Sequence, residues 1–538
     1  MLKIIHRKDY LNKLEQVMDT PDIKVITGMR RSGKSVILSQ FREIILHKVK
    51  EANVLFLDYT KLENEHLQDY HKLNDWIESH YIADKKNYLL IDEVQMCIGF
   101  EKVINSVHSG HGFDIYLTGS NAFLMSSDLA TFFTGRCIEI TVYPFSFAEF
   151  RQYFGYEESL ESAFNEYVRY GGLPGSYVYD LDSSRRENLK ETYTTIVQRD
   201  LIDKFRLTNA VAMNSIAEYL MDNIGNITSP NNVCNSLVSK KVETSHVTAG
   251  NYITYLCRSF IFNECKRYDL KGAKYLETLS KFYLFDHGIR FAILGSRSID
   301  YGRIYENIVY IELLRRGYDV YVGKLYDKEV DFVAMKGSEK FYVQVSDDIS
   351  NKKTLERELE PLGKIKDHYP KFLIANTRHE EYDINGVKVI NIVHWLAGDE
   401  FGLSLADRIR SRINTVMGIS FVSQANAAGY GKTSLNYRMN GGVFIIKGLG
   451  TQFETRWSKA GIHSVYGYKD GVELLGVNSA VHDIPDAQED LEAFDFSSRR
   501  SIFREGMVAV FMNSAGRFLG VKILSVNNGI LEIMYRIY

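Results

Sequence analysis

Two short stretches of the sequence bring together residues that can bind phosphate and a metal ion. In the first, KVITGMRRSGKSVILSQF (residues 24–41), Gly28 to Ser35 fits the pattern GxxxxGK[ST] between an apolar strand and a helical pattern. Small residues let backbone N–H groups surround phosphate oxygens, and the helix N-terminus adds the positive end of its dipole. We predict that Lys34 reaches the β- and γ-phosphates of ATP and that Ser35 binds Mg²⁺. The predicted nucleotide-binding residues are Gly28, Arg31, Ser32, Gly33, Lys34 and Ser35.

The second stretch, YLLIDEV (residues 88–94), places two acids directly after four apolar residues. A buried strand that ends in this way carries the acids to the carboxyl edge of a parallel sheet, beside the phosphate-binding loop. Asp92 is predicted to hold Mg²⁺ through water, and Glu93 to act as the general base for the attacking water. Acids on an ordinary surface are the alternative, but their spacing from the loop makes it the weaker one.

Further polar residues follow the pattern of strands. The segment DIYLTGSNAFL ends a third strand at Thr118-Gly119-Ser120-Asn121, and Ser120 is predicted to orient the water or sense the γ-phosphate. Arg136 lies between a turn glycine and a strand and is a candidate for stabilising transition-state charge, in its own chain or in a neighbouring subunit. A plain surface arginine is an equal alternative. Arg30 lies inside the loop beside Arg31, and at least one of this pair is expected to be solvated.

Several segments together resemble a known family. ITGMRRSGKS, LLIDEVQ, LTGSNAFLMSSDLATFFTGR, PFSFAEF and YGGLPGSY, in this order from about Leu2 to Trp395, are similar to segments of archaeal and bacterial AAA-type ATPases that carry a C-terminal restriction-endonuclease-like domain of unknown function. The resemblance implies a P-loop ATPase, a helical segment, a winged-helix-like module and a nuclease-like module. It defines an ATP-driven engine and leaves its substrate open.

The middle of the chain has the outline of a winged helix. Residues 247–268 (VTAGNYITYLCRSFIFNECKRY) predict a helix that runs into a strand, and a second strand and helix follow. Such a module can place basic and polar side chains against DNA. The candidates are Asn251, Arg258, Lys266, Arg267 and Lys271. Packing against the ATPase or a partner protein is the alternative, because the basic residues are few and acids intervene.

The nuclease-like module departs from the pattern of its family. The resemblance assigns Glu306, on an amphipathic helix, and Asp331, at a strand end, to a metal site, but Gln344 and Ser346 stand where an acid and a lysine are needed. Gln offers a neutral oxygen and Ser offers no positive charge, so we predict a degenerate, catalytically inactive nuclease site. Asp348, on the same face of the strand, could compensate in part.

Composition and texture divide the 538-residue chain and limit its classes. The net charge of −3 gives no global attraction to DNA, the five scattered cysteines fit a reducing compartment, and no apolar run reaches the ~18 residues of a membrane helix. We therefore predict a cytoplasmic α/β protein with no membrane segment. Its predicted parts are a P-loop ATPase core (1–145), a helical segment (146–205), a winged-helix-like module (206–297), a restriction-endonuclease-like module (298–398) and a β-rich C-terminal domain (399–538).

The C-terminal part holds a second GKT, at Gly431–Thr433, which we reject as a nucleotide site because a strand pattern follows it. Trp457, Tyr466, Tyr468 and the pair Arg499-Arg500 are candidates for contacting nucleic acid, although a plain interaction domain for other proteins is the simpler reading. The first functional hypothesis is an Mg²⁺-dependent ATPase that drives conformational change, on DNA in one version. The alternatives are a nucleotide-gated interaction switch and, ranked lower, an ATP-controlled nuclease. Homo-oligomers are expected if Arg136 acts on a neighbouring subunit.

Overall fold

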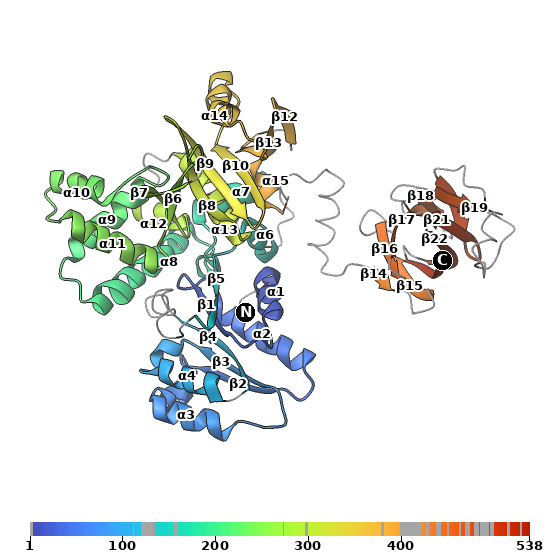
Figure 1. Cartoon of the computed structure of the whole chain (residues 1–538), viewed down its shortest axis with the longest axis horizontal. Coiled ribbons are helices and arrows are strands. Elements are labelled where there is room, and N and C mark those ends of the chain that lie inside the picture. The colour runs from blue at the N-terminus through green and yellow to red at the C-terminus, as the bar shows by residue number, and fades with distance from the viewer. Residues whose placement is uncertain are drawn as a thin grey trace. The chain divides into compact units, whose positions relative to one another are not determined.

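The chain is described from a computed structural model (Figure 1). The described residues are 4–110, 112–119, 133, 135–154, 160–272, 274–295, 300–377, 381–398, 422–424, 430–436, 443–448, 451–461, 464–468, 474–477, 484, 494, 500–513, 517–527 and 530–538. Contacts divide the chain into two compact units, Met1–Gly398 and Asp399–Tyr538, each of which is taken by itself below. Among the described residues, no helix is long and apolar enough to cross a membrane.

The first sheet of the larger unit is parallel throughout, with the strand order β2-β3-β4-β1-β5. Its strands are β1 (Ile23–Gly28), β2 (Asn53–Asp58), β3 (Asn87–Asp92), β4 (Phe113–Thr118) and β5 (Cys137–Val142). The strands β1, β3 and β4 are buried along their whole length, which explains why they are almost uninterrupted apolar runs. Because all strands point the same way, the residues that follow β1, β3 and β4 meet at one edge.

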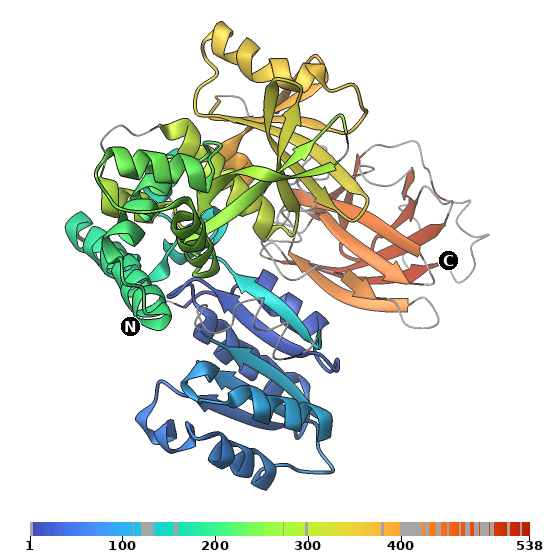
Figure 2. The same cartoon turned by 60° about the vertical axis from the view of Figure 1, so that its left-hand side comes forward.

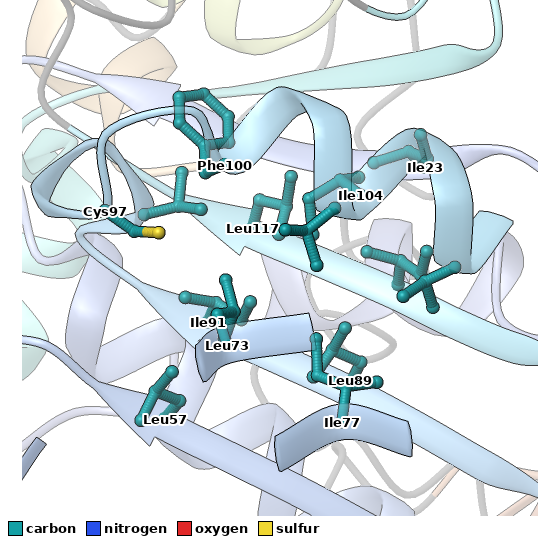
Figure 3. Packing of buried hydrophobic residues seen from close by; sticks show 14 of the residues in the cluster. Ile23, Leu57, Leu73, Ile77, Leu89, Ile91, Cys97, Phe100, Ile104 and Leu117 are labelled. Carbon is teal, nitrogen blue, oxygen red and sulfur yellow. The ribbon is translucent and has the colours of Figure 1, made fainter. Parts of the chain in front are cut away.

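Helices cover both faces of this sheet. The helices α3 (Tyr70–Ser79) and α4 (Phe100–Gly110) pack on one face, and α1 (Lys8–Gln16) and α2 (Lys34–Lys48) pack on the other. Side chains alternate between the faces, so that Leu89 and Ile91 belong to the first core whereas Tyr88 and Leu90 belong to the second. Figure 3 shows Ile77 and Ile104 packed over the first face. Each such buried aliphatic side chain contributes roughly 1.5–3 kcal/mol, and together they hold the carboxyl edge rigid.

A run of helices follows the sheet, in agreement with the helical pattern of residues 146–205. It contains α6 (Phe147–Phe154), α7 (Leu160–Tyr170), the 3₁₀ turn η3 (Pro174–Val178), α8 (Asp182–Thr195) and η4 (Ile196–Asp203), a π-helical segment that continues α8. The YGGLPGSY segment breaks the run because the chain passes too close to its neighbours for side chains. A Cβ on Gly171 would lie 2.0 Å from Oδ1 of Asp286, and a Cβ on Gly172 would lie 2.2 Å from the carbonyl oxygen of Phe145.

Three capped helices and a hairpin come next. The helices are α9 (Ala210–Asp222), α10 (Pro230–Ser239) and α11 (His246–Arg258). Each begins where a side chain accepts a backbone N–H, with Asn209, Ser229 and Ser245 as the caps. The strands β6 (Phe262–Asp269) and β7 (Lys274–Leu284) then pair antiparallel, and α12 (Gly288–Leu294) follows.

The hairpin is part of a second, mixed sheet with the order β12-β13-β11-β10-β9-β8-β6-β7 (Figure 2). Its other strands are β8 (Asp319–Leu325), β9 (Lys328–Lys336), β10 (Glu339–Ser346), β11 (Lys371–Ala375), β12 (Glu381–Ile384) and β13 (Val387–Asn391). The helices α13 (Tyr301–Arg315), α14 (Lys352–Lys364) and α15 (Ile392–Leu396) accompany them. Since β6 pairs parallel with β8, strands on both sides of residue 297 share one sheet.

The smaller unit is rich in strands, arranged as two five-stranded sheets of orders β14-β16-β17-β18-β20 and β15-β23-β22-β21-β19. Its strands are β14 (Val422–Gln424), β15 (Tyr430–Asn436), β16 (Val443–Gly448), β17 (Thr451–Gly461), β18 (Ser464–Tyr468), β19 (Leu474–Val477), β20 (Arg500–Arg504), β21 (Val508–Met512), β22 (Phe518–Asn527) and β23 (Ile530–Ile537). The second GKT lies within β15, paired with β23, and is therefore no phosphate-binding loop. Trp457 is a buried core residue of this unit, so it is not available as the candidate contact for nucleic acid or a ligand.

Candidate functional site

The loop between β1 and α2 has the geometry of a phosphate cradle. Gly28 has φ 134°, and a Cβ there would lie 2.2 Å from the carbonyl oxygen of Val142. Gly33 has φ 98° and begins α2 without any side-chain cap, so the first N–H groups of the helix point to the loop without a capping acceptor. Inside the loop, Oγ of Ser32 is buried and has no partner among the described residues. These donors fit the oxygens of a phosphate.

Among the described residues, the ammonium group of Lys34, in the first turn of α2, donates to backbone carbonyl groups. Its side chain is only 6% exposed, and Nζ donates to the carbonyl oxygens of Gly28 (2.9 Å) and Met29 (3.0 Å). Burial lowers the pKa of Lys34 to about 8, against the opposing influence of Glu93 and Asp92. An ammonium group that binds only neutral carbonyls gains strongly from exchanging them for phosphate oxygens.

Ser35 and Asp92 form the predicted metal pair. Oγ of Ser35 donates to Oδ1 of Asp92 over 3.1 Å, and the hydroxyl of Thr118 donates to the same oxygen. Burial raises the pKa of Asp92, while these two hydrogen bonds lower it. A hydroxyl and a carboxylate side by side at the carboxyl edge are the oxygen ligands that Mg²⁺ takes together with nucleotide phosphates and water. The residues present therefore fit the ion.

Glu93 stands next to this pair in an unusual backbone conformation. Its φ is 56°, and its N–H donates to Oγ1 of Thr118 over 3.1 Å. The carboxylate is half-buried and accepts a hydrogen bond from the side chain of Gln95. A non-glycine residue at positive φ costs free energy and persists where its surroundings fix it. The contact with Thr118 thus fixes the backbone of Glu93 beside Asp92, which accepts from the same hydroxyl.

The other two predicted residues have different outcomes: one lies outside the described residues, and the structure places the other away from this site. Ser120 lies outside the described residues, and the polar group that the structure shows at the end of β4 is Thr118. Arg136 is exposed and directly precedes β5, and its carbonyl accepts from the N–H of Ile23 at the opposite edge of the sheet. A six-residue strand spans roughly 20 Å, so Arg136 does not reach the nucleotide of its own chain.

The helical run contributes residues that the sequence did not reveal. Asp200, in the π-helical segment, lies 3.8 Å from Arg30 (Nη1 to Oδ1) and is buried. Arg31 has φ 65° and donates to Oγ1 of Thr192 over 3.1 Å. Both arginines of the loop therefore face α8 and its extension. About 170 residues separate these partners along the chain, and no local pattern predicts the contact.

Arg7 links the loop to the start of the helical run. Its guanidinium donates to the carbonyl oxygen of Ser32 (2.9 Å), to those of Tyr143 (2.8 Å) and Pro144 (3.3 Å), and to both oxygens of Glu149 (2.8 Å each). The arginine is buried, and the bidentate pair with Glu149 satisfies its charge. One side chain thus fixes the P-loop against the first helix that follows the sheet.

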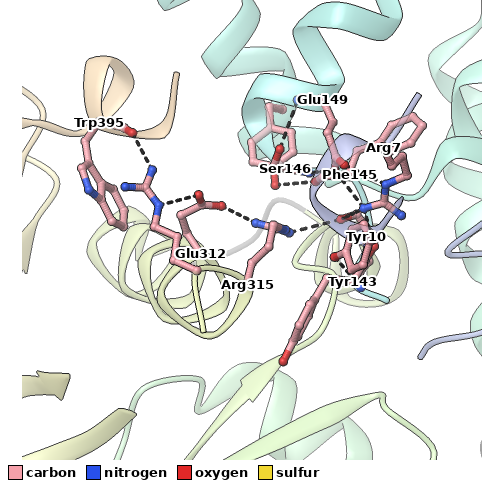
Figure 4. A network of polar contacts seen from close by, with 12 residues as sticks. Arg7, Tyr10, Tyr143, Phe145, Ser146, Glu149, Glu312, Arg315 and Trp395 are labelled. Atoms are coloured by element: carbon pink, nitrogen blue, oxygen red, sulfur yellow. Dashed lines mark hydrogen bonds and ion pairs between the residues drawn. The ribbon is translucent and has the colours of Figure 1, made fainter. Parts of the chain in front are cut away.

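Pro144 continues this series of contacts toward the second sheet. Its carbonyl also accepts from Arg315 (3.1 Å), which pairs with Glu312 one turn away on α13. Glu312 accepts in addition from Arg316 (2.9 Å), whose other nitrogen donates to the carbonyl oxygen of Trp395 (2.9 Å). Figure 4 shows the contacts running from Arg7 to Trp395. Polar groups therefore connect the P-loop to α13 without a break.

The second predicted site is assembled, but with partners that the sequence did not reveal. Glu306, Asp331 and Gln344 are buried and line one cleft of about 420 Å³. Lys281 of β7 places Nζ 2.7 Å from Glu306, 2.6 Å from Glu329 and 3.8 Å from Asp331. Burial alone would lower the pKa of Lys281, but these carboxylates raise it well above its ordinary value. The charge of Lys281 is therefore balanced by carboxylates from two other elements, α13 and β9.

The structure also describes the contacts of Gln344, Ser346 and Asp348. The side-chain amide of Gln344 donates to Glu358 of α14 over 3.0 Å, so the carboxylate of Glu358 lies behind Gln344 at the edge of the cleft. Asp348 is exposed and its carboxylate accepts from Ser350, which rules out its predicted compensating role. The hydroxyl of Ser346 donates to the carbonyl oxygen of Asp348 over 3.2 Å. No three His, Cys, Asp or Glu side chains of the described part of the chain are arranged to hold a metal ion.

The predicted DNA-facing residues lie on the surface. Asn251 and Arg258 of α11 and Lys266 and Lys271 of the hairpin are exposed, while Arg267 is half-buried. Acidic Glu264 and Asp269 lie among them on β6. These described residues therefore mix acidic and basic side chains, unlike the basic stripe that is typical of a duplex DNA-binding surface.

Family models match two parts of the chain. One, described as an AAA domain, covers residues 20–151, and another, a domain of unknown function (DUF8612), covers residues 161–300. Among solved structures, a Walker-type ATPase of Pyrococcus abyssi is 14% identical at a TM-score of 0.38, covering 54% of this chain and 95% of that one. The Aeropyrum pernix ORC1 protein in complex with DNA is 11% identical at a TM-score of 0.23, covering 59% and 95%. Scores this low support no conclusion about this chain.

Two relatives match over most of their length, and both are uncharacterized. A protein of Methanocaldococcus jannaschii is 27% identical over 384 residues, covering 68% of this chain and 84% of that protein. A protein of Haemophilus influenzae is 38% identical over 403 residues, covering 73% of this chain and 98% of that protein. The chain therefore belongs to the family of this Haemophilus influenzae protein, and its residues 20–151 form an AAA-type P-loop domain.

Proposed function

We propose that this chain is an Mg²⁺-dependent ATPase that couples ATP hydrolysis to a change in conformation. The observation that carries the proposal is the joint placement of Lys34, Ser35 and Asp92 beside uncapped helix N–H groups. Ser35 and Asp92 would hold Mg²⁺, which neutralises charge on the β- and γ-phosphate oxygens. These residues come from two different strand ends and converge only through the parallel sheet.

The protein groups divide the work of hydrolysis. Lys34 exchanges the carbonyls of Gly28 and Met29 for phosphate oxygens and stabilises the charge that grows on them. Glu93 orients a water molecule in line with the γ-phosphorus and accepts its proton on the carboxylate. Thr118 holds both acids in register, since it donates to Asp92 and accepts from the N–H of Glu93.

The test is ATP hydrolysis by the purified chain in Mg²⁺, with and without duplex or single-stranded DNA. We expect turnover that Lys34→Ala and Glu93→Gln abolish and that Lys48→Ala, on the exposed end of the same helix, leaves unchanged. Absence of hydrolysis by a folded wild-type chain would contradict the proposal. Stimulation by DNA would assign the three capped helices and their hairpin to a winged-helix DNA-binding role, and no stimulation would direct the search to protein partners, including those of the C-terminal unit. We also propose that the protein acts in the cytoplasm, where its cysteines stay reduced.

Arg136 enters the proposal only through a neighbouring subunit. It is exposed at the far edge of its own sheet, so a role in hydrolysis requires a second copy that presents it to this site. Specific activity would then rise with protein concentration in the wild type, and Arg136→Ala would lower the plateau. An activity that does not depend on concentration and does not respond to Arg136→Ala removes the role.

A nucleotide-gated interaction switch is the second candidate, and the contacts of the P-loop favour it. Arg7, Arg30 and Arg31 tie this loop to segments far from the sheet, so binding alone can change their positions. Slow ATP hydrolysis that neither DNA nor a protein partner stimulates would support the interaction switch over the ATPase that drives conformational change.

We further propose that the module around the second sheet has a restriction-endonuclease-like fold without activity. Lys281 occupies the space between Glu306, Glu329 and Asp331 in which a metal ion would have to lie. DNA incubated with Mg²⁺ and ATP should remain intact. Cleavage that survives Lys34→Ala and fails in Asp331→Ala would show instead that the cleft is an active nuclease despite Gln344 and Ser346.

A further inference from the structure

The P-loop residues at the unspecified positions of the GxxxxGK[ST] pattern contact other parts of the chain. Arg30 faces Asp200 at 3.8 Å, Arg31 donates to Thr192 at 3.1 Å, and the carbonyl of Ser32 accepts from the N-terminal segment at 2.9 Å. Two of the three contacts lead to one continuous element, α8 with its π-helical extension η4. This element therefore touches the nucleotide site directly.

The extension is built around a buried acid. Asp200 lies in the middle of η4 and is only 6% exposed, flanked by the buried apolar residues Val197 and Leu201. A π-helical turn is rare, and it recurs at functional sites because it displaces side chains from the regular helical spacing. A buried carboxylate is costly unless a positive charge faces it. Among the described residues, Arg30 is the cation within ion-pair distance of Asp200.

The charges around Asp200 are those of the nucleotide site. Burial raises the pKa of Asp200, Arg30 and Arg199 lower it, and Glu93 raises it further, while Lys34 acts in the opposite direction to Glu93. The same acid in turn influences Lys34. Charge placed near Lys34 and Glu93 therefore acts on Asp200, whose ion-pair partner Arg30, 3.8 Å away, is itself part of the P-loop.

A γ-phosphate changes this balance in a definite direction. It brings additional negative charge to the side of the site that Lys34 and Glu93 define, and it offers three oxygens to a guanidinium. Arg30, inside the loop and half-buried, is drawn to the phosphate, and Asp200 is repelled by it. ADP, without the γ-phosphate, leaves the pair intact.

We propose that Arg30 and Asp200 form the γ-phosphate sensor of this chain: Arg30 pairs with Asp200 when the γ-phosphate is absent and with the γ-phosphate when ATP is bound. Asp200 is a positioning residue, and its release lets the α8–η4 element shift between two states. The inference rests on the proposed ATPase function and names the group that distinguishes ATP from ADP.

The test compares the affinities of ADP and of a non-hydrolysable ATP analogue by calorimetry, in the full chain with Mg²⁺. Arg30→Gln should weaken the analogue about tenfold and leave ADP within about twofold. Asp200→Asn removes the competing charge and should tighten the analogue by roughly threefold to tenfold with ADP unchanged. Glu191→Gln is the matched control, since this exposed acid on the same element faces Arg31 at 3.9 Å. It should change neither affinity.

A second readout follows the element itself. Hydrogen exchange across Asp182–Asp203 should differ between the ADP and analogue complexes of the wild type, and the difference should vanish in Asp200→Asn. Equal effects of Arg30→Gln on both nucleotides, or an unchanged exchange difference in Asp200→Asn, would overturn the sensor while nucleotide binding stands. A wild-type chain that binds neither nucleotide would overturn the proposed function itself. If Asp200→Asn fails to fold, Arg30→Gln on the half-exposed partner still decides the question.

Discussion

Lys34 and Lys281 are both almost completely buried, and both lie near acids, yet their ammonium groups are held in opposite ways. Lys34 binds two backbone carbonyls, and burial lowers its pKa to about 8. Lys281 binds Glu306 and Glu329 and lies near Asp331, and these carboxylates raise its pKa above the ordinary value. The first lysine has exchangeable neutral partners, whereas the second is already neutralised.

This difference separates a binding site from a structural one. A buried cation with neutral partners has lost its hydration without gaining an opposite charge. An anionic ligand that pairs with it therefore binds with a more favourable free energy. A buried cation inside a carboxylate cluster is already neutralised by the protein. Removing the cation leaves several carboxylates without a compensating positive charge. The P-loop is thus ready for an anionic ligand, while the cation position between Glu306, Glu329 and Asp331 is already filled by Lys281.

The largest expected effect concerns Lys34. Replacement by methionine should lower the rate of ATP hydrolysis by about 10³-fold, because charge on the phosphate oxygens loses its stabilising ammonium. The free energy of unfolding should change by less than about 1 kcal/mol, since only neutral carbonyls lose a partner. Steady-state kinetics and urea unfolding measure the two quantities. A large loss of stability would show that Lys34 is structural, as Lys281 is.

Lys281→Met should give the reverse pattern. The free energy of unfolding should fall by about 3–5 kcal/mol, because Glu306, Glu329 and Asp331 are left facing one another in a buried cleft. ATP hydrolysis per folded molecule should be retained. The control is Lys328→Met, which lines the same cleft but pairs with the exposed Glu360 at 3.1 Å, and should cost no more than about 1 kcal/mol.

The same variant sharpens the comparison further. In the wild type no three acidic side chains of the described residues are arranged to hold a metal ion. With the ammonium removed, Glu306, Glu329 and Asp331 should rearrange around Mn²⁺ or Mg²⁺, so millimolar metal should restore part of the lost melting temperature in Lys281→Met but none in the wild type. Equal responses of the two proteins to metal would mean that Lys281 does not occupy a cation position.

The smallest expected effect is the uptake of a fraction of one proton when nucleotide binds. Since the pKa of Lys34 in the free protein is about 8, part of this side chain is neutral at pH 8.5. Phosphate favours the charged form and raises the pKa, so nucleotide binding should take up a fraction of one proton at pH 8.5 and almost none at pH 6.5. Calorimetry in two buffers of different ionisation enthalpy measures the uptake. Lys34→Met should abolish it.

Local patterns predicted the residues that lie next to one another in the chain or at strand ends. Lys34, Ser35, Asp92 and Glu93 converge because a parallel sheet brings consecutive strand ends to one edge. The same rule excludes Arg136, which precedes its strand and must lie at the other edge, although the prediction did not apply it. Choosing Thr118 requires the strand register, which alternation alone does not set.

The partners that come from distant segments could not be predicted in this way. Asp200 meets Arg30 through a π-helical turn, and no pattern announces where a helix widens. Lys281 follows a serine and precedes a run of apolar residues, so its inward position was readable as a buried charge, but its partners on α13 and β9 depend on how β6 joins the second sheet. Long-range pairing decided both sites.

The helix α13 (Tyr301–Arg315) has a mechanical consequence. Its fifteen residues make a rod about 22 Å long, with Glu306 in the acidic cleft and Arg315 in contact with the carbonyl of Pro144. A helix of this length bends little, so a displacement at Arg315 would be transmitted along α13 to Glu306. If ATP hydrolysis moves the P-loop, as we propose, a displacement carried through Arg7 and Pro144 to α13 would change the spacing of the carboxylates around Lys281.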